Sequence, residues 1–549
     1  MPPMPGRAAG TQAAAKAGRV VLWFRNDLRL DDHYAVWEAQ RRVQQGRAAE
    51  VLPVYCFDPR EWRRTRWSPT KTGAARSQFL RESVADLRAS LEAVGSGLLV
   101  YHARPEEVLP RLLHPSRPTA VLAHGHVASE ELKVERAVQS AVRGGGGELE
   151  LFWGQTLYHY DDLPFDQVAD LPNVFTPFRN KVEKRASVRP LVPAPGPGQL
   201  GPLADDGAGD EDARRALPAL GDLAEGLAAL PPNPHGAAMK GGETAGLARL
   251  RYYLWDTDLV ADYFNTRNGM LGGDYSTKLS PWLAHGCVSP RRVYWELDEY
   301  QRARTSNKST YWVVFELLVR DFFVFFALKH GRKIFLRDGV AGKRWGGPGW
   351  DADPEALRRW KEGRTGFPLV DANMREMAAT GFMSNRGRQN VASYLALDLN
   401  HDWRTGADHF ESQLVDYDVC SNWGNWVSAA GLTGGRLNKF NISKQSRDYD
   451  AAGDYLRTWL PELKNVPARW VHEPWRMPPA EQEACGCVIG RDYPAPLKGA
   501  GGGAGWQQQG QGPRRAGGQK GQKGSGARKG KGCNRRGAQR RKGEFEMYG

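Results

Sequence analysis

Cysteine is scarce in this chain, and its spacing fits no metal site or disulfide framework. Six cysteines occur in 549 residues, and the closest two, Cys485 and Cys487, have no second pair elsewhere. Zinc sites built from paired cysteines need wider spacing and two pairs. The sequence therefore predicts no metal site, and a reducing compartment is the simplest interpretation.

Nucleotide-binding motifs and membrane spans are also missing. No GxGxxG sequence opens a helix and GxxxxGK[ST] is absent, so neither dinucleotide nor P-loop binding is supported. The most apolar run, residues 311–328, contains Glu316, Arg320 and Asp321. Charges at that density disfavour a membrane span, and we expect no membrane partner.

Acidic residues are absent from a long stretch near the C-terminus. Residues 498–542 contain thirteen Lys and Arg and no Asp or Glu, so the rest of the chain carries only +1 of the net charge of +14. This Gly-rich basic tail is predicted to be disordered. Interspersed cations bind phosphates without reading sequence, so we expect the tail to bind nucleic acid, RNA included; a solubilising tail is the alternative.

Tryptophan, by contrast, is abundant, with nineteen residues. The densest stretch reads DYDVCSNWGNW and begins at Asp416. On a helix that starts just after Asp418, Asn422 and Trp426 share a face because residues four apart are neighbours. The two carboxylates then precede the helix, where they suit its unpaired donors and positive dipole end. A capped helix that packs tryptophans into a core is the alternative.

Short apolar runs alternate with helical stretches in the N-terminal part. The runs of strand length are residues 20–24, 51–57, 98–101 and 119–123, and the helical stretches include 77–94 and 129–142. This alternation predicts an α/β domain with a parallel, Rossmann-like sheet of buried strands.

The remaining segments differ in composition. The leader is rich in Ala, Pro and Gly, has two cations and lacks acid, which permits a transit peptide or a disordered leader. Pro, Gly, Ala and acid dominate residues 190–246, which indicates a long connector, whereas a helical pattern dominates afterwards. The predicted divisions are a leader (1–18), an α/β domain (19–160), a connector (161–246), an all-α domain (247–475) and a C-terminal extension (476–549).

The helical part contains two charged patterns that need explanation. The 311–328 stretch is apolar almost all round, which is typical of a buried helix. Glu316 and Arg320 lie four residues apart on it, and a buried charge without a partner costs several kcal/mol; a mutual ion pair is one interpretation. Donors and cations at 385–390 directly precede the apolar helical stripe at 391–399, and such a cluster favours a polar or anionic ligand.

Taken in order over residues 19–475, these motifs resemble the photolyase/cryptochrome family, most closely its DASH class. The turn of residues 25–29 after the first strand is similar to the family's opening signature, and residues 276–286 resemble its flavin loop. The resemblance implies that the all-α domain binds FAD. Hydroxyls and backbone donors at a helix start can hold a diphosphate, although a Ser/Thr run before Pro281 is otherwise an ordinary N-cap.

The resemblance also assigns roles to individual residues. It implies that Asp416 pairs with Arg388 and that Asn422 faces the flavin N5. The implied FAD-binding residues are Tyr263, Ser276, Thr277, Lys278, Leu279, Ser280, Arg320, Arg388, Asp416, Tyr417, Asp418 and Asn422. The implied nucleic-acid contacts are Glu316, Arg320, Asn385, Arg386 and Gln389. The implied catalytic residues are Glu316 and Asn385, together with Trp426, Trp403 and Trp350, which would pass an electron to the flavin unless they are merely core aromatics.

The function implied is blue-light repair of cyclobutane pyrimidine dimers, chiefly in single-stranded DNA. A lesion must leave the base stack, and this costs least in a single strand. Val319 stands where strong photolyases carry an aromatic, and Gln389 where they often carry Met, so duplex repair is expected to be weak. The alternatives are a blue-light photoreceptor without repair and a nucleic-acid binder with a structural flavin.

The antenna, the compartment and the oligomeric state are further expectations. The DASH class implies 5,10-methenyltetrahydrofolate as a light-harvesting antenna, but His126 stands where relatives often have a folate-binding Glu, which leaves folate open. The leader favours a chloroplast or mitochondrion, with the nucleus or cytoplasm as the alternative. We expect a monomer.

Overall fold

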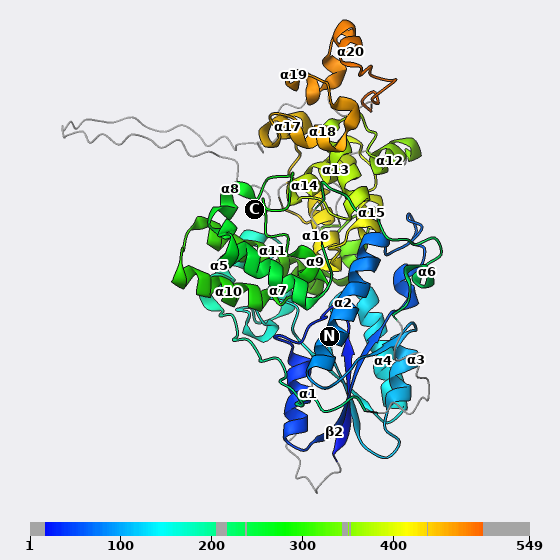
Figure 1. Cartoon of the computed structure of the whole chain (residues 1–549), viewed down its shortest axis with the longest axis vertical. Coiled ribbons are helices and arrows are strands. Elements are labelled where there is room, and N and C mark those ends of the chain that lie inside the picture. Colours follow the sequence, from blue (N-terminus) through cyan, green and yellow to red (C-terminus); the bar gives the residue numbers. More distant parts are fainter. Residues whose placement is uncertain are drawn as a thin grey trace, which may run out of the picture.

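The computed structural model describes residues 17–204, 217–236, 239–342, 350, 353–435 and 437–497. An α/β domain lies at one end of the molecule and a helical domain adjoins it, with helices α17–α20 at the far end (Figure 1). Residues 1–16 of the predicted leader and the basic tail from 498 onward lie outside the described residues. The predicted order of an α/β domain followed by a helical domain is confirmed.

The α/β domain is built on a five-stranded parallel sheet with the order β3-β2-β1-β4-β5. The strands are β1 (Gly18–Phe24), β2 (Ala48–Cys56), β3 (Leu99–Tyr101), β4 (Thr119–His124) and β5 (Glu148–Phe152). Strand β1 is buried along its whole length, as expected for a central parallel strand. The helices of this domain are α1 (Tyr34–Gln44), α2 (Ala74–Ala93), α3 (Pro105–Val108) and α4 (Ser129–Gly144).

The helical domain surrounds α11 (Lys308–His330), which is buried on nearly all sides as its composition predicts. Asn307 caps this helix by accepting hydrogen bonds from the backbone amides of Ser309 and Thr310 at 2.8 and 3.0 Å. The helices before it in this domain are α5 (Phe175–Arg185), α7 (Glu243–Arg251), α8 (Tyr263–Thr266), α9 (Ser280–Ala284) and α10 (Pro290–Ala303), whereas α6 (Leu220–Leu223) contacts α2 of the α/β domain. Those after it are α12 (Pro354–Lys361), α13 (Pro368–Thr380), α14 (Asn385–Ser393), α15 (Trp403–Gln413), α16 (Val419–Ala429), α17 (Ile442–Tyr449), α18 (Asp454–Trp459), α19 (Ala468–Val471) and α20 (Pro479–Cys485).

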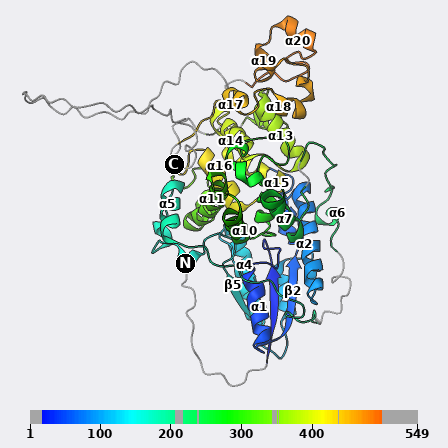
Figure 2. The same cartoon turned by 60° about the vertical axis from the view of Figure 1, so that its left-hand side comes forward.

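The loop after β1 joins the two domains. Asp32 is fully buried and forms a two-pronged ion pair with Arg291 of α10, with both N–O distances at 2.9 Å. Arg29 donates to the backbone carbonyl of Gly286 at 2.8 Å. The backbone amide of Leu28 donates to the backbone carbonyl of His285 at 3.2 Å. Figure 2 shows the blue sheet and the green helices meeting along this junction. The carboxyl end of the central strand therefore faces the helical domain.

Asp27 and His33 of the same loop form a buried cluster with His124 at the end of β4, and the ligand atoms of the three residues lie close enough to hold a metal ion. Both imidazoles instead hydrogen-bond one carboxylate oxygen of Asp27, at 3.0 and 3.1 Å. Burial alone would raise the pKa of Asp27. The two histidines have the larger combined effect in the opposite direction, so the pKa lies well below its usual range. The His33 Nδ1 accepts from the Val36 amide, so its Nε2 carries the proton that Asp27 accepts. The geometry is that of a hydrogen-bonded cluster.

Residues 476–497 of the predicted C-terminal extension pack against the helical domain. The Tyr493 hydroxyl donates to the buried carboxylate of Asp371 at 2.6 Å. The amide of Leu497 donates to the carbonyl of Thr365 at 3.0 Å. Within the described ranges, no helix combines the length and the apolar character that crossing a membrane requires.

Candidate functional site

A cavity of about 330 Å³ opens in the helical domain, between α11, α14, α16 and the loop that leads into α9. This volume is within the range of small-molecule and cofactor sites. Most of the residues implied by the resemblance line it, although they come from four separate segments of the chain. They are Tyr263, Ser276, Thr277, Lys278, Leu279, Ser280, Glu316, Arg320, Asn385, Arg388, Gln389, Asp416, Tyr417, Asp418, Asn422 and Trp426.

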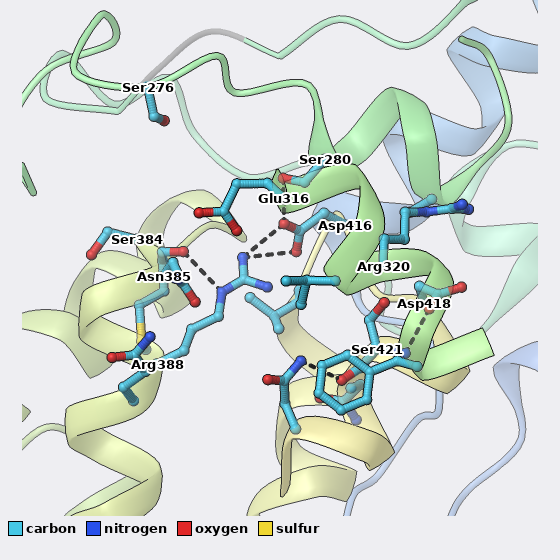
Figure 3. A pocket seen from close by; sticks show the side chains of 18 of the residues that line it. Ser276, Ser280, Glu316, Arg320, Ser384, Asn385, Arg388, Asp416, Asp418 and Ser421 are labelled. Atoms are coloured by element: carbon cyan, nitrogen blue, oxygen red, sulfur yellow. Dashed lines mark hydrogen bonds and ion pairs between the residues drawn. The ribbon is translucent and has the colours of Figure 1, made fainter. Parts of the chain in front are cut away.

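An ion pair between Arg388 and Asp416 ties two walls of the cavity together (Figure 3). The Arg388 Nη2 lies 2.9 and 2.7 Å from the two carboxylate oxygens of Asp416, and the Ser280 hydroxyl donates to the same carboxylate at 2.6 Å. The pairing expected of Arg388 and Asp416 is therefore present. Charge-assisted hydrogen bonds of this kind fix side chains strongly, so α9, α14 and the turn before α16 share one anchor.

Helix α16 presents its polar and aromatic side chains as its sequence predicts. It begins at Val419, and its N-cap Asp418 accepts from the backbone amide of Ser421 at 2.7 Å. Asn422 and Trp426 both face the cavity. The Asn422 amide nitrogen donates to the carbonyl of Ala407 at 3.0 Å, which fixes the orientation of the side chain at the cavity wall.

Lys278 places a buried amine at the cavity. Its φ of 56° is in the left-handed region, which non-glycine residues rarely adopt. The ammonium lies over the rings of Tyr275 and Phe382, 3.8 and 4.1 Å from their centroids. Burial lowers the pKa of Lys278 to about 7, against the opposing effect of Glu376. An anionic ligand would restore the charge on this amine.

Glu316 and Arg320 do not form the mutual ion pair that their spacing allows. The Glu316 carboxylate lies 3.6 Å from the guanidinium of Arg267. Arg320 instead donates to the backbone carbonyls of Gln155 and Leu283. Burial raises the pKa of Glu316, and Arg267 partly opposes the shift. A carboxyl at a cavity wall can hydrogen-bond a bound ligand.

Three of the predicted residues lie outside the cavity lining. Arg386 lies beside it and donates to the amide oxygens of Gln389 and Asn268, both at 2.9 Å. Trp403 is fully buried and donates to the Arg337 carbonyl at 3.1 Å. Trp350 is half-buried, and its immediate neighbours in sequence lie outside the described residues.

Sequence reasoning missed several residues of the cavity. Arg267, Tyr275, Phe382 and Ser384 all line it. Arg267 follows a four-residue helix in a segment without periodicity, so no pattern separated it from a surface arginine. Ser384, by contrast, precedes the polar cluster at 385–390, and N-cap preference could have identified it. The helix begins at Asn385 itself, so this cluster occupies the first turns of α14 and does not precede it.

The donors around the cavity suit a flavin dinucleotide. Arg388 and Lys278 supply positive charge, and Ser276, Thr277 and Ser280 supply hydroxyls beside a helix start. These are the groups that bind a diphosphate. Asn422 and Trp426 lie on a separate wall, where an amide and an indole can contact a planar ring system.

Comparison with known proteins supports this interpretation. The family model described as the FAD binding domain of DNA photolyase matches residues 312–500, and the one described as DNA photolyase matches residues 20–197. A cryptochrome DASH of Ostreococcus tauri, described as chloroplastic/mitochondrial, is 50% identical and the match covers 87% of this chain and 90% of that protein. The chain belongs to the cryptochrome DASH group of the photolyase family.

Further similar proteins agree with this chain in sequence or structure. The protein of Gloeobacter violaceus is 48% identical over 87% of this chain and 92% of its own length. The crystal structure of a Synechocystis cryptochrome is 47% identical and has a TM-score of 0.80 over 87% of this chain and 96% of that one. A class III photolyase of Agrobacterium tumefaciens is 26% identical, with a TM-score of 0.72 over 89% and 96%. The protein is therefore an FAD flavoprotein of this family.

Proposed function

We propose that the protein repairs cyclobutane pyrimidine dimers under blue light, chiefly in single-stranded DNA. The observation that carries this proposal is the single cavity that brings Glu316 and Asn385 to the same space as Arg388, Asp416 and Asn422. Family membership supports binding to DNA. The Glu316 carboxyl, which would contact a damaged base, thus lines the same cavity as the groups suited to a flavin.

The residues of the chain would hold and orient the cofactor. When bound and reduced, FAD supplies an electron to the lesion after it absorbs blue light. Lys278 and the hydroxyls before α9 would neutralise its diphosphate, while the Arg388–Asp416 ion pair keeps α14 and α16 at a fixed separation. Asn422 would present its amide to the flavin ring.

The lesion would enter from the side of α11. Burial raises the pKa of Glu316; its carboxyl would hydrogen-bond a pyrimidine of the lesion, and Arg267 at 3.6 Å holds its orientation. Asn385 is exposed at the rim of the cavity. Val319 lines the cavity with a small aliphatic side chain, which offers less stacking for a flipped dimer than an aromatic. This is the reason for proposing a single-strand preference.

The proposal is tested with a thymine dimer in matched single-stranded and duplex oligonucleotides, under blue light with reductant, after bound FAD has been confirmed by absorbance. Repair confined to the single strand is the expected result. Glu316→Ala should lose repair but keep FAD. Failure of the parent protein to repair either substrate, with photoreducible flavin present, would contradict the proposal.

The second candidate function is a blue-light photoreceptor that signals without repair. Trp426 lines the cavity and contacts the buried rings of Trp360 and Phe410. This contact favours the photoreceptor, because an electron that Trp426 gives to the flavin would alter the protein without any repair reaction. Trp426, Trp403 and Trp350 would carry the electron in either case. Trp426→Phe should slow photoreduction; an unchanged rate would argue against this route.

Further proposals concern the partners of the protein. The basic tail would bind nucleic acid, RNA included, and truncation after Leu497 should make binding less dependent on salt, because each lost phosphate contact reduces the slope. We also propose that the protein is a monomer and that it is sent to a chloroplast or mitochondrion, like the relatives described as chloroplastic/mitochondrial. We propose 5,10-methenyltetrahydrofolate as the antenna, which extraction of the bound chromophores would test.

A further inference from the structure

Trp423 connects the cavity to the buried Trp403. Its side chain projects from α16 and is 8% exposed. Its ring centroid lies 5.8 Å from that of Trp403, at an interplanar angle of 77°. Its Nε1 donates to the hydroxyl of Tyr417 at 3.3 Å, and Tyr417 lines the cavity. Trp423 is thus in contact with both a wall of the cavity and a member of the proposed tryptophan relay.

The hydrogen bond of the Trp423 indole distinguishes it from two neighbouring tryptophans. Trp423 Nε1 also donates to the Oε2 of Glu411, at 3.4 Å. The indoles of Trp403 and Trp360 donate to backbone carbonyls, both at 3.1 Å. A backbone carbonyl accepts a hydrogen bond but is too weak a base to take up the proton, whereas a carboxylate can take it up. An oxidised indole is acidic, so of these three residues Trp423 has an acceptor for the proton it would release.

We propose that Trp423 is a further electron donor of this site and that Glu411 is the base that takes its indole proton. The inference rests on the proposed flavin photochemistry. One electron leaves Trp423 and passes through Trp403 and Trp426 to the photoexcited oxidised flavin. The Nε1–H bond breaks, and an O–H bond forms on Glu411. A neutral tryptophanyl radical remains until an external thiol supplies one electron. The thiol is thereby oxidised to a thiyl radical and loses its proton to water, and Glu411 returns its proton to the indole nitrogen.

The surroundings of Glu411 set the pH at which this base is available. Glu411 lies on α15, its side chain is 7% exposed, and Lys71 Nζ lies 3.9 Å from its Oε1. Burial raises the pKa of Glu411 to about 7, while Lys71, Arg76 and a hydrogen bond from Tyr417 lower it and Glu61 raises it. Glu411 is therefore mainly ionised above about pH 7 and mainly protonated below. Glu411 can therefore accept the proton of Trp423 above about pH 7, but below that pH it is already protonated and cannot.

The test uses the full chain loaded with oxidised FAD and excited by a blue flash. Transient absorption and electron paramagnetic resonance distinguish a neutral tryptophanyl radical from the radical cation. The yield of the neutral form should be about tenfold higher one pH unit above 7 than one unit below, because the ionised fraction of a group with that pKa changes by this factor. A light-minus-dark infrared spectrum should show a new carboxylic acid band.

Two variants and one control isolate the pair. Trp423→Phe should lose the neutral radical, and Glu411→Gln should lose both the radical and the infrared band while FAD content is retained. Trp255→Phe removes a different indole–carboxylate pair, in which Nε1 lies 2.7 Å from Glu296, and should change neither signal. A neutral radical that persists in Trp423→Phe, or a pH profile unchanged in Glu411→Gln, overturns the inference alone. Absence of any light-induced radical in the parent protein overturns the proposed photochemistry and the inference with it.

Discussion

At the scale of single residues, the carboxylate of Asp416 depends on Arg388 for charge compensation. The Asp416 side chain is 2% exposed, whereas that of Arg388 is 27% exposed. Replacing Arg388 with Met would leave a buried carboxylate with the Ser280 hydroxyl as its remaining side-chain donor. We expect a loss of about 3 kcal/mol in the free energy of unfolding, measured by urea denaturation. The double variant Arg388→Met/Asp416→Asn should lose less than the two single losses combined; full additivity would contradict the coupling.

Lys278 makes cofactor affinity depend on pH. In the free protein its pKa is about 7 because of burial, and a bound anion would raise that pKa toward its usual value. The bound form then carries more protons than the free form above pH 7, so FAD affinity is fully present below about pH 7 and falls as the pH rises. Fluorescence titration with FAD at several pH values measures this. Lys278→Met should bind more weakly and show a flatter profile; an affinity that rises with pH in the parent protein would contradict the sign.

At the scale of secondary structure elements, the start of α16 determines where Asn422 and Trp426 point. Asp418 caps the helix, and Asp418→Ala should cost about 1 kcal/mol. Asp418→Ser retains a capping oxygen and serves as the matched control. Thermal unfolding gives the stability, and FAD binding reports the position of Asn422. Equal losses from both variants would show that the cap is not what stabilises the first turn.

Local patterns predicted four strands of the sheet and several of the helices, and their failures have physical causes. Continuous apolar runs identified β1, β2, β3 and β4, but β5 alternates Glu148 and Glu150 with leucines at the edge of the sheet, so it contains no continuous apolar run. The start of α16 followed from capping chemistry around Asp418. The Arg267–Glu316 contact joins segments far apart in sequence, and such pairing has no local signature. The cavity residues could be assembled in advance only through the family resemblance.

At the scale of the whole molecule, the buried pair of Asp32 and Arg291 couples the two domains. The side chains are 0% and 3% exposed, and Asp32→Ala leaves the guanidinium unpaired at the junction. We expect a loss of about 3–5 kcal/mol. Calorimetry should show a lower unfolding temperature for the variant than for the parent protein, because the junction loses its buried ion pair while its backbone hydrogen bonds remain. The exposed pair of Arg302 and Asp298 provides a control, since Asp298→Ala should cost less than about 1 kcal/mol.

The junction has a further consequence for how a ligand reaches the protein. Open parallel sheets usually bind nucleotides in the crevice outside their carboxyl ends, where the strand order reverses. In this chain that position lies between β1 and β4, and in the loop after β1 Arg29 and Asp32 form buried hydrogen bonds with the helical domain. A hinge at this joint would have to break an ion pair shielded from water. Opening of the cavity therefore has to come from loop and side-chain movement at its own mouth, and the rate of ligand entry should not depend on closure of one domain onto the other.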